Sequence, residues 1–416
     1  MKSQPLPAAL QTKRFEEKRE AILGAAARLF NERGVKGATF ADIGAEVGMA
    51  TNSITYYYRR KEELACACFL RATEAFDEVA ETAGRETTIA ARLRSFLRLH
   101  AALLARIDSG AVPPIIFFDE LHALPEAQLQ LVYAAYTAMF RKVRRLLAGP
   151  ETVGLSRDEL TARTHLLLSV AHWLRRWIWR HEPSQYDRLA DRVLDLLMNG
   201  LSEPTAAWQP LGIESEWTLV NEAGGTSDAF LRAATRLINE QGYEGASVAK
   251  ISAVLNLTKG AFYHHHETKD DLVEACFERS FALVRRALEL AEAPPAEGWE
   301  RLAAMTRALI RVQLAPEGPL LRAAATSAIP NSGHREEVRR TLQQLAERIA
   351  SLVVDGMVDG SLRRVDAGVA AQIVMAGINA TAEAHRWMKI RDVEQVVQLY
   401  ARPLLVGLLA APASGD

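Results

Sequence analysis

The sequence predicts an all-α protein in which one helical unit is written twice. Apolar residues recur with the helical period along stretches of about 15 to 25 residues, and no alternating β-branched runs predict strands. The stretch AILGAAARLFNERGVKGATFADIGAEV, from Ala21, returns as AFLRAATRLINEQGYEGASVAKISAVL, from Ala229, and KEELACACF, from Lys61, returns as KDDLVEACF, from Lys269. About 19 of roughly 50 positions are identical without a gap, at a period of about 208 residues. Below, residues 12–201 are the first copy and residues 227–410 the second copy.

The composition is that of an ordinary globular chain. Its 416 residues are 49% hydrophobic and 24% charged, with a formal net charge of −1, which excludes disorder and a uniformly basic surface but permits a local basic patch. At about 100 to 200 residues per domain, the length predicts two to four domains. The first residues run into a charged segment without an apolar core, and no stretch is long and apolar enough for a membrane span. We therefore expect a cytoplasmic protein with no membrane partner.

The first copy opens with an apolar stripe that predicts a helix ending near Gly34. The stripe consists of Ile22, Ala25, Ala26, Leu29 and Phe30. Thr39 is expected to cap a second short helix, with Asp42 three residues later where a carboxylate meets exposed amides. That helix stops at Gly48, and a third helix over 51–58 follows a tight turn. The same plan recurs in the second copy.

The second copy differs in its chemistry at the helix starts and in the third helix. Ser247 takes the capping role, but Lys250 stands where the acid was, so the helix dipole favours this start less. Between the matching flanks, TNSITYYYRR in the first copy faces KGAFYHHHET in the second without one identity. A helix that stops at Gly, turns and restarts is the geometry of a helix-turn-helix, whose second helix can enter a DNA major groove.

The residues of both segments resemble the TetR family of bacterial transcriptional regulators. In the second copy, LTKGAFYHHHETKDDL, Leu257 to Leu272, is similar to the family's recognition-helix signature, and MATNSITYYYRRKEEL, Met49 to Leu64, is a looser match. The resemblance covers about 50 residues at the start of each copy. Three positions depart from the pattern, namely Ala50, Thr55 and His266. Ala50 stands where the pattern has a hydroxyl cap, Thr55 where it has an aromatic residue, and His266 where it usually has a buried aromatic residue.

The remaining helices of each copy follow from periodicity and from Gly and Pro breaks. In the first copy we expect helices over 62–82, 88–107, 125–148, 156–180 and 186–201, and Ser156 with Glu159 predicts a capping box for the fourth. The second copy is expected to end in helices over 366–388 and 392–409. The segment 202–226 lacks helical period and links the copies, although its Trp208, Leu211, Ile213 and Trp217 are expected to pack on a domain surface.

The resemblance implies a domain organisation. It comprises helix-turn-helix DNA-binding heads over 12–61 and 227–269, helical ligand-binding and dimerisation domains over 62–201 and 270–410, and the linker 202–226. In the resembled family the last two helices of each subunit form a four-helix homodimer bundle. Here both halves lie on one chain, so we expect a monomeric pseudo-dimer, with a higher oligomer left open. The stripes expected to close this bundle are Val170, Trp173, Leu174 and Trp177 in the first copy, and Met375, Ile378 and Trp387 in the second.

Double-stranded operator DNA is the expected partner of the two heads. Residues 12–74 carry 11 Lys and Arg against 9 Asp and Glu, whereas residues 227–281 carry 6 against 8, so the first head is the better candidate for phosphate contact. In the expected third helix of each head, an Asn side chain can bind the edge of an adenine and a Lys side chain the edge of a guanine. Tyr hydroxyls there can donate to phosphate. The expected DNA-contacting residues are Thr39, Thr51, Asn52, Ser53, Thr55, Tyr56, Tyr57, Arg60, Lys61, Ser247, Thr258, Lys259, Gly260, Tyr263, His264, His265 and Lys269. The resemblance implies phosphate contact for the two lysines, Lys61 and Lys269.

A small apolar or aromatic effector is the expected ligand of the first copy. Between Thr88 and Ala148 the first copy carries six aromatic side chains, whereas Trp299 is the only one in the corresponding stretch of the second copy. Such a stripe also suits an ordinary core, but two repeats of one scaffold do not need different core aromatics. The expected ligand-binding residues are Phe96, His100, Phe117, Phe118, His122, Tyr136, Phe140, Trp173 and Arg176.

Other chemistry finds little support. The three consecutive histidines 264–266 diverge by about 100° each around a helix and cannot converge on one metal ion. Cys66 and Cys68 suit small packing positions better than a redox switch. Asp119 with His122 lacks a nucleophile, a metal spacing or a phosphate loop, so we expect no catalytic residues and no cofactor.

The interpretation is a ligand-responsive DNA-binding regulator, a repressor, that acts on an operator with non-identical half-sites. The alternative is a ligand-binding or protein-interaction module on the same fold that has lost DNA binding, and an α-helical enzyme is a distant third. A regulator predicts basic residues clustered around Lys61 and Lys269, whereas an interaction module predicts an apolar patch there.

Overall fold

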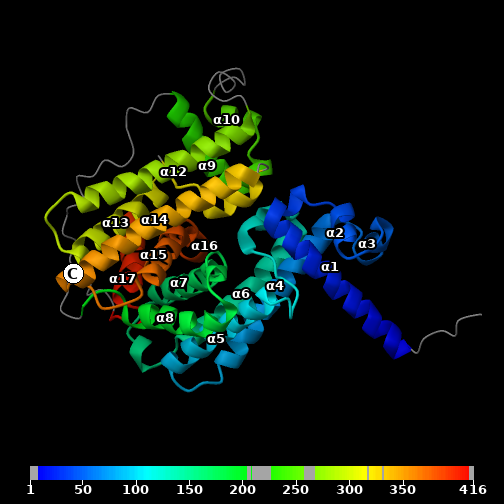
Figure 1. The fold of residues 1–416 in the computed structure, drawn as a ribbon, viewed down its shortest axis with the longest axis horizontal. Coiled ribbons are helices and arrows are strands. Elements are labelled where there is room, and N and C mark those ends of the chain that lie inside the picture. Colours follow the sequence, from blue (N-terminus) through cyan, green and yellow to red (C-terminus); the bar gives the residue numbers. More distant parts are fainter. Residues whose placement is uncertain are drawn as a thin grey trace, which may run out of the picture. The chain divides into compact units, whose positions relative to one another are not determined.

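The computed structural model describes residues 8–203, 208, 226–256, 268–315, 318–329 and 332–411 (Figure 1). Within these ranges the chain forms helices, and the β-structure is limited to an isolated antiparallel bridge between Ser202 and Leu362. The predicted all-α fold with two tandem copies is therefore confirmed. None of the described helices is both long and apolar enough to cross a membrane.

The helices of the first copy follow the predicted order. The α-helices are α1 Ala8–Gly37, α2 Phe40–Glu46, α3 Thr51–Tyr57, α4 Lys61–Ala83, α5 Ile89–Asp108, α6 Glu126–Leu146, α7 Arg157–Leu174 and α8 Tyr186–Asn199. Short 3₁₀ helices between them are η1 Phe118–Ala123, η2 Pro150–Thr152, η3 Ile178–Arg180 and η4 Pro183–Gln185.

The second copy repeats this order over the described residues. Its α-helices are α9 Thr226–Gly245, α10 Val248–Val254, α12 Lys269–Glu292, α13 Gly298–Leu314, α14 Ser332–Asp359, α15 Ala367–Thr381, α16 Ala384–Trp387 and α17 Val393–Val406, with the 3₁₀ helix η5 Ala323–Ala328. The chain divides into two compact units. The first unit contains the described residues within 1–78 and 106–139, and the second contains the described residues within 79–105 and 140–416.

In the first unit, helices α1, α2 and α3 form the head that the sequence predicts, drawn in blue in Figure 1. The predicted stripe of α1 is buried, and the helical path breaks at Gly34, whose φ of 74° suits glycine. Thr39 caps α2, because its hydroxyl oxygen accepts from the Asp42 amide at 3.1 Å while the Asp42 carboxylate accepts from the Thr39 amide at 2.9 Å. The turn into α3 requires Gly44, since a Cβ there would lie 2.5 Å from the Met49 carbonyl oxygen.

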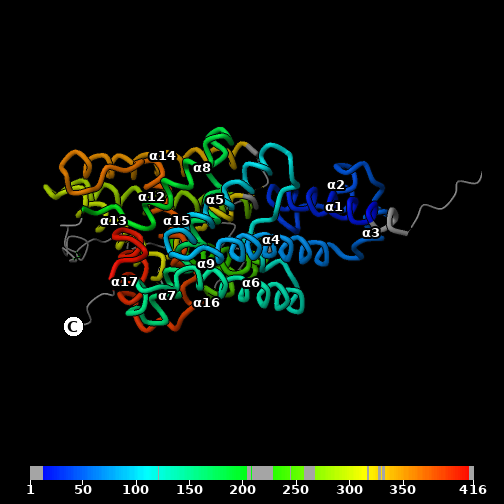
Figure 2. The backbone as a smooth tube through the Cα atoms, turned by 90° about the horizontal axis from the view of Figure 1, so that it is seen from below, coloured from blue at the N-terminus to red at the C-terminus, as the bar shows by residue number. Residues whose placement is uncertain are grey.

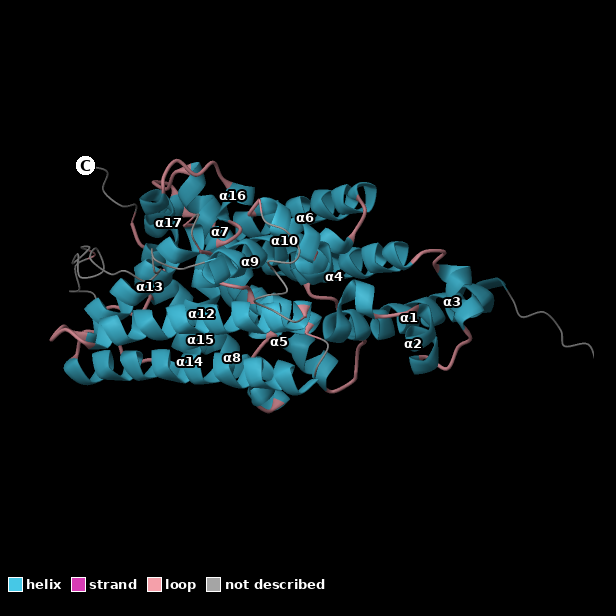
Figure 3. Cartoon of the chain, turned by 90° about the horizontal axis from the view of Figure 1, so that it is seen from above, coloured by secondary structure: helices cyan, strands magenta, loops and turns pink. Residues whose placement is uncertain are grey.

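In the second unit, the long helices of the second copy pack side by side. Helix α12 contacts α9, α13 and α14, and α15 contacts both α13 and α14 (Figure 3). Trp208, from the linker, also joins this unit. Its indole nitrogen donates to the Gln398 side chain at 2.7 Å and its ring lies 6.1 Å from that of Trp299. The expected packing of Trp208 is confirmed, whereas Leu211, Ile213 and Trp217 lie outside the described residues.

The last two α-helices of the first copy pack against the last three of the second copy. Helix α7 contacts α15, α16 and α17, and α8 contacts α15 and α17 (Figure 2). Polar contacts cross between the copies here. The Trp173 indole donates to the Gln372 side-chain oxygen at 3.0 Å, and a nitrogen of the His165 ring lies 2.7 Å from the Tyr400 hydroxyl oxygen. The four helices that the sequence assigns to a bundle therefore lie in one compact unit.

Two predicted helix ends were wrong. Helix α7 ends at Leu174 and not near residue 180, because the chain turns there and then buries Trp177 and Ile178. The helix expected over 366–388 is broken after Thr381, and the short α16 follows. At the end of α7, burial of Trp177 and Ile178 and not local periodicity sets where the helix stops.

Candidate nucleic-acid interface

Helix α3 presents polar side chains outward and apolar side chains inward. Thr51 and Asn52 are exposed, and Tyr56 is 77% exposed. Ile54 and Tyr58 are buried on the opposite side. Ser53 and Thr55 lie between these extremes, and the Thr55 hydroxyl donates to the Asn52 carbonyl oxygen at 2.9 Å. The helix therefore has one outer face able to reach a ligand as large as DNA.

The N-terminal part of α1 packs on this helix through aromatic rings. Phe15 stacks on Tyr57 with ring centroids 4.7 Å apart and ring planes 27° apart. Tyr56 meets Tyr57 edge to face at 5.4 Å. Burial raises the pKa of Tyr57, so its phenol stays a neutral donor. Tyr58 is part of the head's core, where burial raises its pKa and the charge of Arg19 opposes that shift.

Basic side chains follow α3. Arg59 and Arg60 are exposed, whereas Lys61 is half-buried. The Lys61 ammonium donates to the carbonyl oxygens of Lys36 and Ala38 at 2.8 and 2.9 Å. Lys61 therefore joins the start of α4 to the end of α1, and its contact with phosphate stays a prediction.

Thr39, another expected DNA-contacting residue, also makes its side-chain contacts within the head. Its hydroxyl contacts the Asp42 carboxylate at 2.6 Å. Hydrogen bonds from the Thr39 side chain and backbone, with the nearby charge of Arg33, hold the pKa of Asp42 below its ordinary value. Asp42 thus stays ionised, and the capping box fixes the entry of α2.

The second head shows the same cap with different charges. The Ser247 hydroxyl accepts from the Lys250 amide at 3.3 Å, as expected for a cap. The Lys250 ammonium donates to Gln241 and to the Gly245 carbonyl. Lys269 donates to the Tyr243 carbonyl oxygen and lies over the Tyr243 ring. The remaining DNA candidates of this head lie outside the described residues, namely Thr258, Lys259, Gly260, Tyr263, His264 and His265.

The expected ligand-binding residues fall into two groups, one in each compact unit. Those of the first unit are Phe117, Phe118, His122 and Tyr136, all half-buried. Phe118 meets the ring of Tyr136 edge to face at 5.1 Å and lies 6.2 Å from Phe69. Aromatic side chains thus gather around Phe118 within the first copy.

The group in the second unit consists of Phe96, His100, Phe140, Trp173 and Arg176. Phe96 and His100 are fully buried on α5, and a nitrogen of the His100 ring lies 3.0 Å from the Ala171 carbonyl oxygen. Burial lowers the pKa of His100 to about 3, so this imidazole is neutral. Arg176 lies over the Trp173 ring at 5.4 Å.

The three cysteines are buried and unpaired with one another. Cys66, Cys68 and Cys276 are buried thiols, and burial raises the pKa of both Cys68 and Cys276 to about 12. A thiol that stays protonated is a poor nucleophile. In the part of the chain that the structure describes, His, Cys, Asp and Glu form no group able to hold a metal ion.

Sequence reasoning missed four polar residues that hold the heads. Asn31 and Asn239 each bind two backbone groups of a distant segment. Arg71 and Arg279 pair with an acid on the first helix of their own copies. The available signal was identity between the copies, because each pair occupies equivalent positions of the repeat.

Comparisons with known proteins agree with the tandem arrangement. The family model for "Bacterial regulatory proteins, tetR family" matches residues 22–68 and again residues 230–276. The chain is similar to the HTH-type transcriptional repressor DhaR of Mycobacterium sp. (strain GP1), at 30% identity over 135 residues, 31% of this chain and 66% of the relative. It is also similar to the Transposon Tn10 TetC protein of Escherichia coli, at 36% identity over 59 residues, 14% of this chain and 30% of the relative.

The chain thus spans less than two thirds of the length of both curated relatives. Among solved structures, AibR in complex with isovaleryl coenzyme A and operator DNA is 24% identical. That alignment covers 44% of this chain and 98% of AibR, with a TM-score of 0.37.

Proposed function

Because this chain belongs to the TetR family of bacterial transcriptional regulators and carries the family's N-terminal segment twice, we propose that it is a ligand-responsive repressor in which one chain supplies both DNA-reading heads. The observation that carries the proposal is this double match, at residues 22–68 and 230–276. In a regulator built from two identical subunits, the palindromic operator mirrors the two-fold symmetry of the dimer. A single chain with two unlike heads needs no such symmetry.

Contacts between the copies support the pseudo-dimer part of the proposal. Helices α7 and α8 pack against α15 and α17 within one compact unit. The buried Arg163 of α7 donates to the Leu408 carbonyl oxygen just after α17. Arg363, which precedes α15, pairs with Asp195 of α8 at 3.0 Å. These contacts join elements that two subunits contribute in a dimeric regulator.

Exposed residues of the first head support DNA contact there. Thr51 and Asn52 offer hydrogen-bonding groups for base edges, and Arg59 and Arg60 offer charge for phosphates. The second head has the lower balance of basic over acidic residues, and its Lys250 and Lys269 bind groups of their own head. We therefore assign most of the phosphate affinity to the first head and expect the two half-sites to differ.

The aromatic group of the first copy supports an apolar or aromatic effector. Phe118 and Tyr136 supply edge-to-face partners for an uncharged ring system. An effector that binds one conformation better than another shifts the population toward that conformation. DNA is released when the spacing of the two heads in that conformation does not match the spacing of the half-sites.

The proposal is tested by selecting bound sequences from a random pool of DNA duplexes with the purified full chain. Enrichment of a defined site supports DNA-binding regulation. Retention of no sequence above background contradicts it and favours an interaction module on the same fold. That second candidate has some support of its own, because Lys61 and Lys269 both bind backbone carbonyls within their heads.

A further inference from the structure

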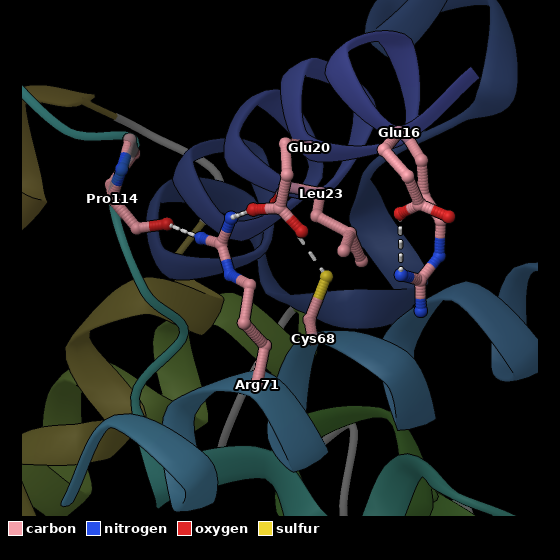
Figure 4. A network of polar contacts seen from close by, with 7 residues as sticks. Glu16, Glu20, Leu23, Cys68, Arg71 and Pro114 are labelled. Atoms are coloured by element: carbon pink, nitrogen blue, oxygen red, sulfur yellow. Dashed lines mark hydrogen bonds and ion pairs between the residues drawn. The ribbon is translucent and has the colours of Figure 1, made fainter. Parts of the chain in front are cut away.

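A polar network ties the first helix of the first head to α4 and to the segment 113–117 (Figure 4). Arg71 of α4 pairs with Glu20 of α1 at 3.0 Å and also donates to the Pro114 carbonyl oxygen. Beside it, the Cys68 thiol lies 3.6 Å from the Leu23 carbonyl oxygen. Arg71 therefore holds a helix and a distant segment at once.

The second copy contains the same network at positions 208 residues further on. Arg279 pairs with Asp228 at 3.1 Å, and the Cys276 thiol lies 3.5 Å from the Leu231 carbonyl oxygen. Both copies thus keep an acid on the first helix, α1 or α9, and a Cys and an Arg three residues apart on the long helix α4 or α12. The sequences TNSITYYYRR and KGAFYHHHET, at corresponding positions of the two copies, share no residue, so this network belongs to the part of the repeat that stayed alike.

An asparagine completes the network in each copy. The Asn31 side chain donates to the Ile115 carbonyl oxygen at 2.9 Å and accepts from the Phe117 amide at 2.8 Å. The Asn239 side chain donates to the Leu320 carbonyl oxygen at 2.8 Å and accepts from the Arg322 amide at 3.0 Å. The NH₂ group and the oxygen of one side-chain amide thus bind backbone groups of residues two apart, which fixes the distance and the orientation of the segment.

Close packing reinforces the attachment of these clamped segments, residues 113–117 and 318–322. A Cβ on Gly24 of α1 would lie 2.5 Å from the Pro113 Cβ. A Cβ on Gly318 would lie 2.4 Å from the Arg279 guanidinium. The first clamped segment therefore has little room to slide along α1, whereas Gly318 of the second clamped segment lies against the Arg279 side chain of α12.

We propose that Asn31 and Asn239 are positioning residues that couple each clamped segment to its DNA-reading head, so that segment and head change conformation together. The inference rests on the proposed function and specifies how a change in a helical domain reaches the DNA. A bidentate side-chain contact of this kind has two states, made or broken, as a coupled element requires.

The two clamped segments differ in what they contact beyond their own heads. In the second copy the clamped residue Arg322 also binds Glu383, at 2.6 Å, where the chain leaves α15. The second head is therefore tied to the helices that pack against α7 and α8. In the first copy the equivalent clamped residue is Phe117, one of the expected ligand-binding residues. In this proposal the first clamped segment carries a residue of the expected effector site, whereas the second clamped segment contacts the chain just after the end of α15.

Hydrogen exchange at the clamped amides tests the coupling. Coupling between two sites is reciprocal, so if the segment biases DNA affinity, DNA must change how often the segment opens. We expect a selected duplex to slow exchange of the Phe117 and Arg322 amides in the full chain by about fivefold or more. In Asn31→Ala the Phe117 amide should lose this response while Arg322 keeps it, and Asn239→Ala should show the reverse.

Matched controls separate loss of coupling from loss of folding. Glu32→Ala removes an exposed neighbour of Asn31 on the same helix, and it should respond to DNA like the unaltered chain. The intact response of the other copy in each Asn variant reports that the chain is folded. A Phe117 amide that still responds to DNA in Asn31→Ala would overturn the coupling alone. Failure to select any DNA would overturn the proposed function as well, so the two failures are distinct.

Discussion

The ring of Phe140, in the first copy, stacks on the ring of Trp387, in the second copy, with centroids 3.9 Å apart and planes 12° apart. The His165 ring lies 5.6 Å from the same indole and contacts the Tyr400 hydroxyl. An aromatic stack between residues so far apart in sequence joins the copies by side-chain packing. It gives the pseudo-dimer a specific contact that mutation can remove.

We expect Trp387→Ala to lower the free energy of unfolding by about 2 to 4 kcal/mol, because a large aromatic side chain leaves a packed site. Adding Phe140→Ala should cost less than the sum of the two single changes, with a coupling energy of about 0.5 to 1.5 kcal/mol. Urea unfolding of the four chains of this cycle measures the coupling. Trp179→Ala, which removes an indole that is 61% exposed, serves as the control and should change stability little. If the two changes in the free energy of unfolding add within error, the ring stack contributes no coupling energy between the copies.

The exposed Arg59 and Arg60 should supply phosphate contacts. Changing both to Ala should weaken binding to all DNA sequences alike and lower the salt slope of the binding constant by about one for each phosphate that is no longer neutralised. Fluorescence anisotropy on a labelled duplex at several salt concentrations measures this slope. Lys61 is left intact, because its ammonium holds the end of α1. Arg340→Ala removes an exposed charge of α14 as the control, and an equal reduction of the slope in it would count against a specific role for the arginine pair.

Asn52, exposed on α3, should read a base in one half-site. Asn52→Ala should relax the preference at one base pair by about 1 to 3 kcal/mol and leave the other half-site unchanged. Repeating the selection from the random pool with the variant measures both preferences. A selected site that is a perfect palindrome, with the unaltered chain, would contradict the assignment of unlike heads.

Stability should fall as the solution is acidified from pH 7.5 to pH 5.0. Burial lowers the pKa of His165 and His172 from the ordinary 6.5 to about 4, and that of His100 to about 3. Over this interval the unfolded chain binds more protons than the folded chain, so each histidine disfavours folding by about 2 kcal/mol at the lower pH. Urea midpoints at each pH measure the decrease.

A substitution assigns this pH dependence to the buried histidines. His165→Gln should flatten the stability curve between pH 7.5 and 5.0, since one of the titrating groups is gone. His385→Gln, at an exposed position, is the control and should keep the slope of the unaltered chain. An unchanged slope in His165→Gln would rule out its contribution.

The sequence predicted correctly those features that depend only on residues close together along the chain, namely helix caps and the apolar face of a helix. The cap of Thr39 with Asp42 and the cap of Ser156 with Glu159 are both formed as capping boxes, since each needs only a hydroxyl and an acid three residues apart. The buried stripe of α1 was predicted for the same reason. The end of α7 was not, because burial of Trp177 and Ile178 depends on the rest of the fold.

The partners of polar side chains escaped prediction where they lie far along the chain. Lys61 binds carbonyls more than twenty residues earlier, and Asn31 binds a segment more than eighty residues later. In sequence both look like exposed residues of a helix surface. Periodicity states which face a residue occupies but not what that face meets.

The mass of the complex between the full chain and its selected DNA duplex tests the central claim most directly. Static light scattering on the purified complex should give one chain of 45.9 kDa on one duplex that carries two unlike half-sites. A complex of two chains on one duplex, stable on dilution, would contradict the claim that a single chain supplies both heads.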